Sequence, residues 1–213
     1  MDKPQAGPGR DTTRNSRLKR AVDVLAAGSG LLLLGPLLVL LALAVKVTSP
    51  GPVFFCQERV GRGGRNFRIL KFRTMVADAE RRGLHITAGG DSRITPVGRV
   101  LRHYKMDELP QLWNVLSGDM SLVGPRPEVA KYVALYSPEQ RRVLEVRPGI
   151  TDPASLAYRH EEALLAQAAD PERFYVETVM PAKLRINLDY INHRTFVRDL
   201  AVLLRTVHTS AKG

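Results

Sequence analysis

The stretch AVDVLAAGSGLLLLGPLLVLLALAVKV, residues 21–47, decides the fold, because it has no charged side chain from Val24 to Val45. An apolar run of roughly 20 residues is long enough for a helix to cross the hydrocarbon core of a bilayer. A cleaved signal peptide has a shorter apolar part and a small-residue cleavage site, neither of which fits here. A soluble helix is disfavoured because the run has no polar face. The run therefore predicts a membrane segment.

The middle of this run predicts a break. Pro36 follows Gly35, and a proline inside a helix removes one backbone hydrogen bond and clashes with the preceding turn. Both flanks are basic, and basic flanks prefer the cytoplasmic side of a membrane. The flanking residues are Arg10, Arg14, Arg17, Lys19 and Arg20 before the run, and Lys46, Arg59, Arg62, Arg65, Arg68, Lys71 and Arg73 after it. We therefore favour a re-entrant helix–break–helix hairpin, with Gly35 and Pro36 at the break, over a straight crossing.

The composition fits one domain with a membrane element. The chain has 213 residues, and 32 Lys and Arg against 21 Asp and Glu give a formal net charge of +11. Polyanions are the expected partners, whether lipid headgroups, nucleic acid or nucleotide phosphates. The single cysteine, Cys56, excludes an intrachain disulfide and a cysteine-based zinc site, and it fits a reducing compartment.

The remainder of the chain predicts a small domain of class α+β. We expect a disordered basic segment over residues 1–16, the membrane hairpin over 17–47 and a cytoplasmic α/β catalytic domain over 48–213. VFFCQERV and NFRILKFRTM indicate two β segments joined at Gly61–Gly64, a stretch that fits a hairpin turn better than a phosphate-binding loop. Helices are expected near 95–106, from Pro110, in 131–146 and in 161–170. Residues 196–207 predict an amphipathic helix that suits the membrane surface and core packing equally.

The stretch RHYKMDELPQLWNVLSGDMSLVGPRP, residues 102–127, carries the candidate chemistry. Asp107 and Glu108 are adjacent carboxylates, which raise each other's proton affinity unless a cation lies near. Pro110 suits the first position of a helix, so the two acids precede a helix N-terminus that favours phosphate. From these residues alone, an acidic helix cap is the favoured interpretation and a nucleophile is the alternative.

Five motifs in order add a resemblance. They are TSPGPVFFCQERVG (48–61), LKFRTM (70–75), DSRITPVGRVLR (91–102), DELPQLWNVLSGDMSLVGPRP (107–127) and VRPGIT (146–151). The chain thereby resembles the bacterial sugar transferases, the small monotopic phosphoglycosyl transferases. The resemblance implies a re-entrant helix broken at a proline, although many members have Ser where Gly35 stands. Members also differ after Thr151, where this chain reads DPASLAYRHEE, so the sugar is left open.

The resemblance also implies a mechanism. Asp107 would attack the phosphorus that bears the sugar in a UDP-sugar, and UMP would leave. Polyprenyl (undecaprenyl) phosphate would then attack the aspartyl phosphosugar. Mg²⁺ would assist the leaving group, with Asp107 and Glu108 as its candidate ligands. Glu108, the second catalytic candidate, could instead act as a base, and the sequence leaves both roles open. This reaction would be the first membrane step of surface glycoconjugate synthesis, on the cytoplasmic face of the bacterial inner membrane.

Four basic residues are the candidate substrate contacts. Arg126 matches a nucleotide-contacting residue of the family, and Arg102 a basic residue near the phosphate. Lys71 and Arg73 alternate along a predicted strand, so both would face one pocket and contact the diphosphate. The competing interpretations are a surface arginine in a turn for Arg126 and an ordinary solvated strand face for Lys71 and Arg73.

The rival functions are weaker. A nucleic-acid-binding membrane protein would explain the charge, but aromatic residues make up only 6% of the chain, too few for a stacking platform. An aspartyl-phosphate phosphatase would need an Asp-x-Asp pattern that this chain lacks. A non-catalytic membrane scaffold also fits the apolar run. We thus expect a UDP-sugar, polyprenol phosphate and anionic lipids as partners, with no nucleic acid and a homodimer possible.

Overall fold

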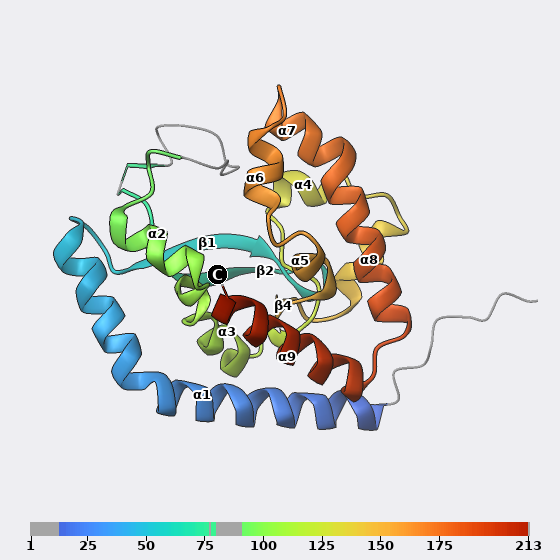
Figure 1. Ribbon diagram of the computed structural model, residues 1–213. Coiled ribbons are helices and arrows are strands. Elements are labelled where there is room, and N and C mark those ends of the chain that lie inside the picture. Colours follow the sequence, from blue (N-terminus) through green and yellow to red (C-terminus); the bar gives the residue numbers. More distant parts are fainter. Residues whose placement is uncertain (1–12, 77, 80–90, 213) are drawn as a thin grey trace, which may run out of the picture.

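The computed structural model describes residues 13–76, 78–79 and 91–212 of the chain, so most of the predicted disordered segment lies outside it. The described part mixes helices with short strands (Figure 1). The first elements are α1 (Thr13–Thr48), β1 (Phe54–Val60), η1 (Arg62–Gly64), β2 (Asn66–Phe72), α2 (Pro96–His103), η3 (Met106–Glu108), α3 (Gln111–Ser117) and β3 (Ser121–Val123). They are followed by α4 (Ala130–Val133), η4 (Gln140–Glu145), β4 (Gly149–Thr151), α5 (Pro153–Ala157), α6 (Glu161–Ala166), α7 (Pro171–Phe174), η5 (Tyr175–Val179), α8 (Met180–Asn192) and α9 (Phe196–Lys212).

Helix α1 is one continuous helix with Pro36 inside it, rather than two helices separated by a break. It begins at Thr13, earlier than the predicted boundary at residue 17. Figure 1 shows it bent sharply near its middle, with one arm below the domain and the other rising along the side. A bend without a break is reasonable, because one proline removes a single backbone hydrogen bond and the neighbouring bonds continue the helix.

Both arms of α1 pack against the same domain. In the first arm, Ala27 is fully buried in a cluster with Val115 of α3 and Met120. In the second arm, Val45 is buried with Phe72 of β2 and Leu101 of α2. The other side of the helix is apolar and exposed, at Leu25, Leu32, Leu33, Val39, Leu40 and Leu43. Among the described residues, α1 is the one helix long and apolar enough to cross a membrane.

The strands form two small sheets. β1 and β2 pair antiparallel as the predicted hairpin, and the turn contains Gly63 and Gly64 with φ of 67° and 76°. These positive φ values favour glycine, which explains the Gly-rich connection. β3 and β4 pair parallel, and a Cβ on Gly149 would lie 2.1 Å from the backbone nitrogen of Gly124. This close approach fixes the start of the segment that continues to Arg126.

The helices after β3 build the second half of the domain. Tyr132, Val143, Leu165, Val179 and Leu184 form its buried cluster, drawn from α4, η4, α6, η5 and α8. Much of the apolar face of helix α9 is exposed on the surface of the domain rather than packed against the core. Phe196, Val197, Leu200, Leu204 and Val207 are exposed, while Asp199 is buried. Core packing therefore does not account for the exposed apolar side of α9.

Candidate active site

The two adjacent acids lie in η3, the turn directly before α3, as predicted. Lys105 precedes them with a left-handed backbone (φ 57°), which reverses the chain after α2. Pro110 then occupies the N-cap of α3 with a φ of −61°. Proline suits such a position because its missing amide is not needed there. The local sequence thus directs the two carboxylates to different surroundings within one turn.

Glu108 is the anchor of a charged cluster. Its Oε1 accepts hydrogen bonds from Nζ of Lys71 at 2.8 Å and from Nη2 of Arg126 at 2.5 Å. Its Oε2 accepts from Nη1 of Arg126 at 3.2 Å, so the arginine binds both oxygens. Burial alone would raise the pKa of Glu108, but the charges of Arg126 and Lys71 outweigh it and hold the pKa well below its usual range. Two of the four predicted cations are therefore brought together, across 18 residues in one case and 37 in the other.

Asp107 has the opposite environment. Its side chain is buried, with the residue only 6% exposed, and its Oδ1 has no hydrogen-bond partner among the described residues. Burial raises the pKa of Asp107, and the negative charge of Glu108 raises it further. Lys71, Arg102 and Lys105 lie near enough to oppose this effect. A buried carboxylate oxygen without a partner is costly unless an incoming group supplies a hydrogen bond or a charge, so this atom is a candidate for contact with a ligand.

Arg102 and Arg73 differ in their relation to this cluster. Arg102 of α2 acts on the charge of Asp107 and lies 3.7 Å from Glu162 of α6, so the structure brings it to the edge of the site. The diphosphate contact expected of Arg73 stays a prediction. Arg73 follows the last residue of β2, and its Nη2 donates to the carbonyl of Ser49 at 2.7 Å. Arg73 thus ties the second arm of α1 to the domain.

The acids allow a limited test of the predicted Mg²⁺ site. Both oxygens of Glu108 are already bound by cations, so Glu108 does not suit a metal ligand in this arrangement. Within the described ranges, no group of three or more His, Cys, Asp or Glu side chains is placed to hold a metal ion. Asp107 keeps one unpartnered oxygen. This fits Mg²⁺ only in the manner common for nucleotide substrates, with one carboxylate and the substrate phosphates as ligands.

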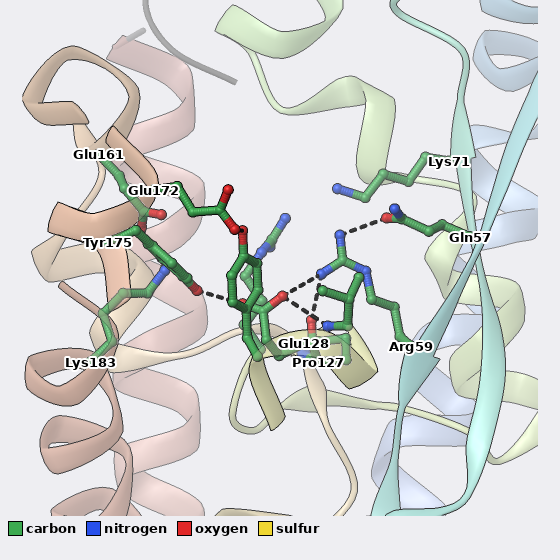
Figure 2. Close-up of polar contacts among 12 residues, drawn as sticks. Gln57, Arg59, Lys71, Pro127, Glu128, Glu161, Glu172, Tyr175 and Lys183 are labelled. Carbon is green, nitrogen blue, oxygen red and sulfur yellow. Dashed lines mark hydrogen bonds and ion pairs between the residues drawn. The ribbon is translucent and has the colours of Figure 1, made fainter. Parts of the chain in front are cut away.

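A second buried network lies beside the cluster and was not predicted. Glu128 accepts from Nη1 of Arg59 at 3.0 Å and from the hydroxyl of Tyr175, and Arg59 also donates to Gln57 at 2.7 Å (Figure 2). Figure 2 shows Lys71, Gln57 and Arg59 projecting from the hairpin toward this network. The charge of Arg126 acts on Arg59, so the two clusters adjoin. The alternation of Gln57 and Arg59 on β1 could have indicated a shared face, but their partners are distant in sequence.

The divergent region after Thr151 contributes a cap close to Arg126. Asp152 is fully buried, and its Oδ1 accepts from the backbone nitrogens of Ala154 and Ser155 at 2.8 and 3.0 Å. The negative charge of Asp152 helps to raise the pKa of Arg126, after the larger effect of Glu108. The Asp-Pro-Ala-Ser stretch is a readable helix start, since Asp suits the N-cap and Pro the next position.

The chain is similar in sequence to known proteins along most of its length. Residues 14–213 match the family described as bacterial sugar transferase. The chain is 44% identical over 194 residues to a UDP-glucose:undecaprenyl-phosphate glucose-1-phosphate transferase of Caulobacter vibrioides, covering 89% of this chain and 68% of that protein. It is 39% identical over 201 residues to a UDP-N-acetylgalactosamine-undecaprenyl-phosphate N-acetylgalactosaminephosphotransferase of Aeromonas hydrophila, covering 92% of this chain and 44% of that protein.

A third relative has a length close to that of this chain. The exopolysaccharide production protein PSS of Rhizobium leguminosarum is 36% identical over 197 residues, which cover 89% of this chain and 93% of that protein. The chain spans less than half the length of the Aeromonas relative. The family match covers both arms of α1, the hairpin, the acidic turn and all helices through α9. On this match, the chain belongs to the bacterial sugar transferase family.

Proposed function

We propose that this chain transfers a sugar-1-phosphate from a UDP-sugar to undecaprenyl phosphate and releases UMP, through a covalent intermediate on Asp107. The names of the Caulobacter and Aeromonas relatives support the donor and acceptor classes. These two relatives carry different sugars, so the sugar is a matter for assay. The acceptor class and the apolar surface of α1 support action at the membrane.

The observation that carries the proposal is the contrast between the two adjacent acids. Glu108 is bound by Lys71 and Arg126, whereas Asp107 is buried and keeps Oδ1 without a partner. A carboxylate with a raised pKa is more basic, and hence a better nucleophile, than an ordinary aspartate. The cations next to it suit the diphosphate of a nucleotide sugar, because guanidinium and ammonium groups bind phosphate oxygens strongly.

The proposed reaction has two displacement steps at one phosphorus atom. An Oδ atom of Asp107 attacks the phosphorus that bears the sugar, and the bond from this phosphorus to the bridging oxygen breaks. UMP leaves with that oxygen, and an aspartyl phosphosugar remains. A phosphate oxygen of undecaprenyl phosphate then attacks the same phosphorus, the bond to Asp107 breaks, and the carboxylate is restored. Lys71 and Arg126 stabilise the negative charge on the phosphate oxygens in both steps, because Glu108 fixes the positions of the two cations.

Mg²⁺ would be held by Asp107 together with phosphate oxygens of the donor, and would supply charge neutralisation of the diphosphate when bound. Glu108 keeps its two cationic partners and orients them. Arg102 adds positive charge at the edge of the site, where it opposes the charge of Asp107. The division of roles therefore assigns chemistry to Asp107 and positioning to Glu108.

We also propose that α1 is re-entrant and that the domain lies on the cytoplasmic face. Both arms pack on one domain, so both ends of the helix are held on the same side of the bend. The exposed apolar residues at the outer side of the bend are available for the lipid core. Basic flanks on both sides of the helix agree with one cytoplasmic face.

The covalent step is tested by incubating the purified full-length chain with a UDP-sugar and Mg²⁺ but without acceptor. Intact mass should increase by one sugar phosphate, and UMP should appear in an amount equal to the enzyme. Adding undecaprenyl phosphate should remove the adduct and start turnover. Asp107→Asn should form no adduct, whereas Asp119→Asn, an exposed acid after α3, should behave as the parent. Turnover in the Asp107→Asn variant, or release of UDP in place of UMP, would refute the proposal.

The membrane arrangement is tested with single cysteines. Cys56 is the one native cysteine and is exposed on β1, so it reports on the domain itself. In a Cys56→Ser background, Arg17→Cys and Val47→Cys stand at the two ends of α1. An impermeant thiol reagent should label neither in spheroplasts and both in inverted vesicles. Labelling of one of the two in spheroplasts would establish a straight crossing.

A further inference from the structure

A basic cavity lies between the first arm of α1, the hairpin turn and the segment before β4. Its volume is about 60 Å³, several times what one water molecule needs. Five cationic and two acidic side chains line it, namely Lys19, Arg20, Arg62, Arg147 and Arg194 with Asp23 and Glu145. Ser121 and Val123 of β3 and Gly124 also line it, whereas the cluster of Lys71, Glu108 and Arg126 does not.

Three of the arginines are held by neutral oxygens. Arg20 donates to the carbonyls of Val115 and Leu116 at 2.6 and 3.0 Å. Arg62 donates to the carbonyl of Glu145 at 3.1 Å, and Arg147 to that of Gly118 at 2.8 Å. Within the described part of the chain, none of the three forms an ion pair. Their geometry is thus fixed while their positive charge is left to be balanced by something else.

Asp23 balances this charge only in part. Asp23 is buried, and its two oxygens accept from the hydroxyl of Ser121 at 2.8 Å and the backbone nitrogen of Leu122 at 3.2 Å. Lys19 is already paired with Asp199 at 2.6 Å. Burial lowers the pKa of Arg147, and the charges of Arg20 and Arg62 lower it further. The charge of Asp23 opposes this effect without reversing it, so repulsion among the three arginines remains. An anion between them would convert this repulsion into attraction.

The residues around the cavity indicate which kind of molecule would supply the anion. Leu18, next to Lys19, is 59% exposed, and Val197, shortly after Arg194, is 73% exposed. Exposed apolar side chains beside a group of cations are typical of a surface at the level of lipid headgroups. Planar guanidinium groups suit phosphate, which they bind through two parallel hydrogen bonds.

We propose that this cavity is a second phosphate site, separate from the active site, and that a phospholipid headgroup occupies it. The bound headgroup would join the first arm of α1 to the hairpin turn and to the segment before β4. Because β3 and Gly124 form one side of the cavity, the lipid would also brace the segment that leads to Arg126. The proposal does not depend on the identity of the sugar or on the covalent step.

The test uses the full-length chain, stripped of lipid in a neutral detergent. Dioctanoyl phosphatidylglycerol is the lipid probe, dioctanoylglycerol the control without a phosphate, and inorganic phosphate the free anion. The readouts are the rise in the thermal unfolding midpoint and lipid retention in native mass spectrometry. The variants are Arg147→Gln and Arg62→Gln. Arg65→Gln is the matched control, because Arg65 is exposed on the same hairpin turn but does not line the cavity.

We expect the phospholipid to stabilise the parent and Arg65→Gln, with half-saturation shifted about tenfold upward in Arg147→Gln because one charge-assisted contact is lost. Arg62→Gln should shift in the same direction and serves if Arg147→Gln folds poorly. Arg126→Gln should leave the lipid effect unchanged. Equal lipid binding in the parent and both cavity variants would overturn the proposal. So would a lipid effect lost in Arg126→Gln alone. Stabilisation by inorganic phosphate without any effect of the lipid would overturn the headgroup assignment.

Discussion

Replacing Glu108 with glutamine should destabilise the protein far more than an ordinary surface change. Glu108 is the shared acceptor for Lys71 and Arg126, at 2.8, 2.5 and 3.2 Å. Glutamine keeps the size of the side chain but removes the charge. It therefore leaves two largely enclosed cations facing each other without a carboxylate. The loss arises from the uncompensated charge rather than from a cavity.

The magnitude follows from the exposure of the partners. Removing one member of a buried ion pair costs about 3–5 kcal/mol. The side chain of Lys71 is 18% exposed and that of Arg126 is 34% exposed, so water partly solvates Arg126 and the lower part of the range applies. We expect about 2–4 kcal/mol for Glu108→Gln. In a chain of this size, 1 kcal/mol shifts the unfolding midpoint by about 2–4 °C, which predicts a decrease of about 5–15 °C.

A double-mutant cycle makes this prediction specific to the ion cluster. Lys71→Met alone leaves Glu108 with Arg126 and should cost about 1–2 kcal/mol. In Glu108→Gln/Lys71→Met, one of the two unpaired cations is gone, so the combined loss should be smaller than the sum by about 1–3 kcal/mol. The assay is thermal unfolding of the detergent-solubilised chain. Additive losses, or a midpoint for Glu108→Gln within 2 °C of the parent, would refute the reasoning, because both require that the cations do not depend on this carboxylate.

Four further outcomes follow from the same geometry. The acid limb of the pH profile of kcat/KM should lie above pH 4, the approximate pKa of an ordinary aspartate, because burial and Glu108 raise the pKa of Asp107 and the reacting form is ionised. In Glu108→Gln this limb should move to lower pH. An unmoved limb would contradict the assignment to Asp107. Chelation of divalent ions should stop UMP release while leaving the unfolding midpoint unchanged, since Lys71 and Arg126, not a metal, hold Glu108; a fall in the midpoint would contradict this. Gly98→Ala should destabilise the folded protein by about 2 kcal/mol or more, because the new Cβ would lie 2.0 Å from the carbonyl oxygen of Thr74. Gly35→Ala should not lower the unfolding midpoint, because a Cβ there would have no atom within 4 Å. Asp152→Ala should lower the stability by about 0.5–2 kcal/mol, because the N-cap of α5 is lost. It should also raise KM for the donor, because the charge of Asp152 acts on Arg126. An unchanged KM would show that Asp152 serves only as the helix cap.

Local patterns account for what the sequence predicted. The uncharged run with Pro36, the Gly-rich hairpin turn and the acids ahead of Pro110 each depend on residues close together in the chain. The structure has the bend in α1, the β1–β2 pair and the turn η3 at these places. Helix α8 was missed because its sequence, MPAKLRINLDYIN, buries Asn187 and Tyr190 and so lacks a clear apolar period.

The features that the sequence did not predict depend on contacts between residues far apart in the chain. The role of Arg73 depends on where β2 ends, and that end is set by the pairing of Phe72 with Phe54. The resemblance to the family made Glu108 a candidate metal ligand together with Asp107. Its actual partners come from β2 and from the segment after β3, and no local pattern indicates that both cations bind the same acid. The network of Arg59, Glu128 and Tyr175 was missed for the same reason.

The two neighbouring acids illustrate how adjacent residues acquire different roles. A pair of titratable groups whose surroundings push their pKa values apart is a common way to separate functions in a site. Here the low pKa of Glu108 results from two cations, and in the proposed reaction a direct ion pair between these cations and Asp107 would make that carboxylate a weaker nucleophile. In the proposed reaction, Glu108 binds these cations and so keeps positive charge close to the phosphorus, while Asp107 retains an unpartnered oxygen. A longer side chain is needed for this task, because Glu108 must reach both β2 and the segment after β3. Exchanging the two acids, as Asp107→Glu/Glu108→Asp, should therefore fail to restore activity even though the charge of the turn is unchanged.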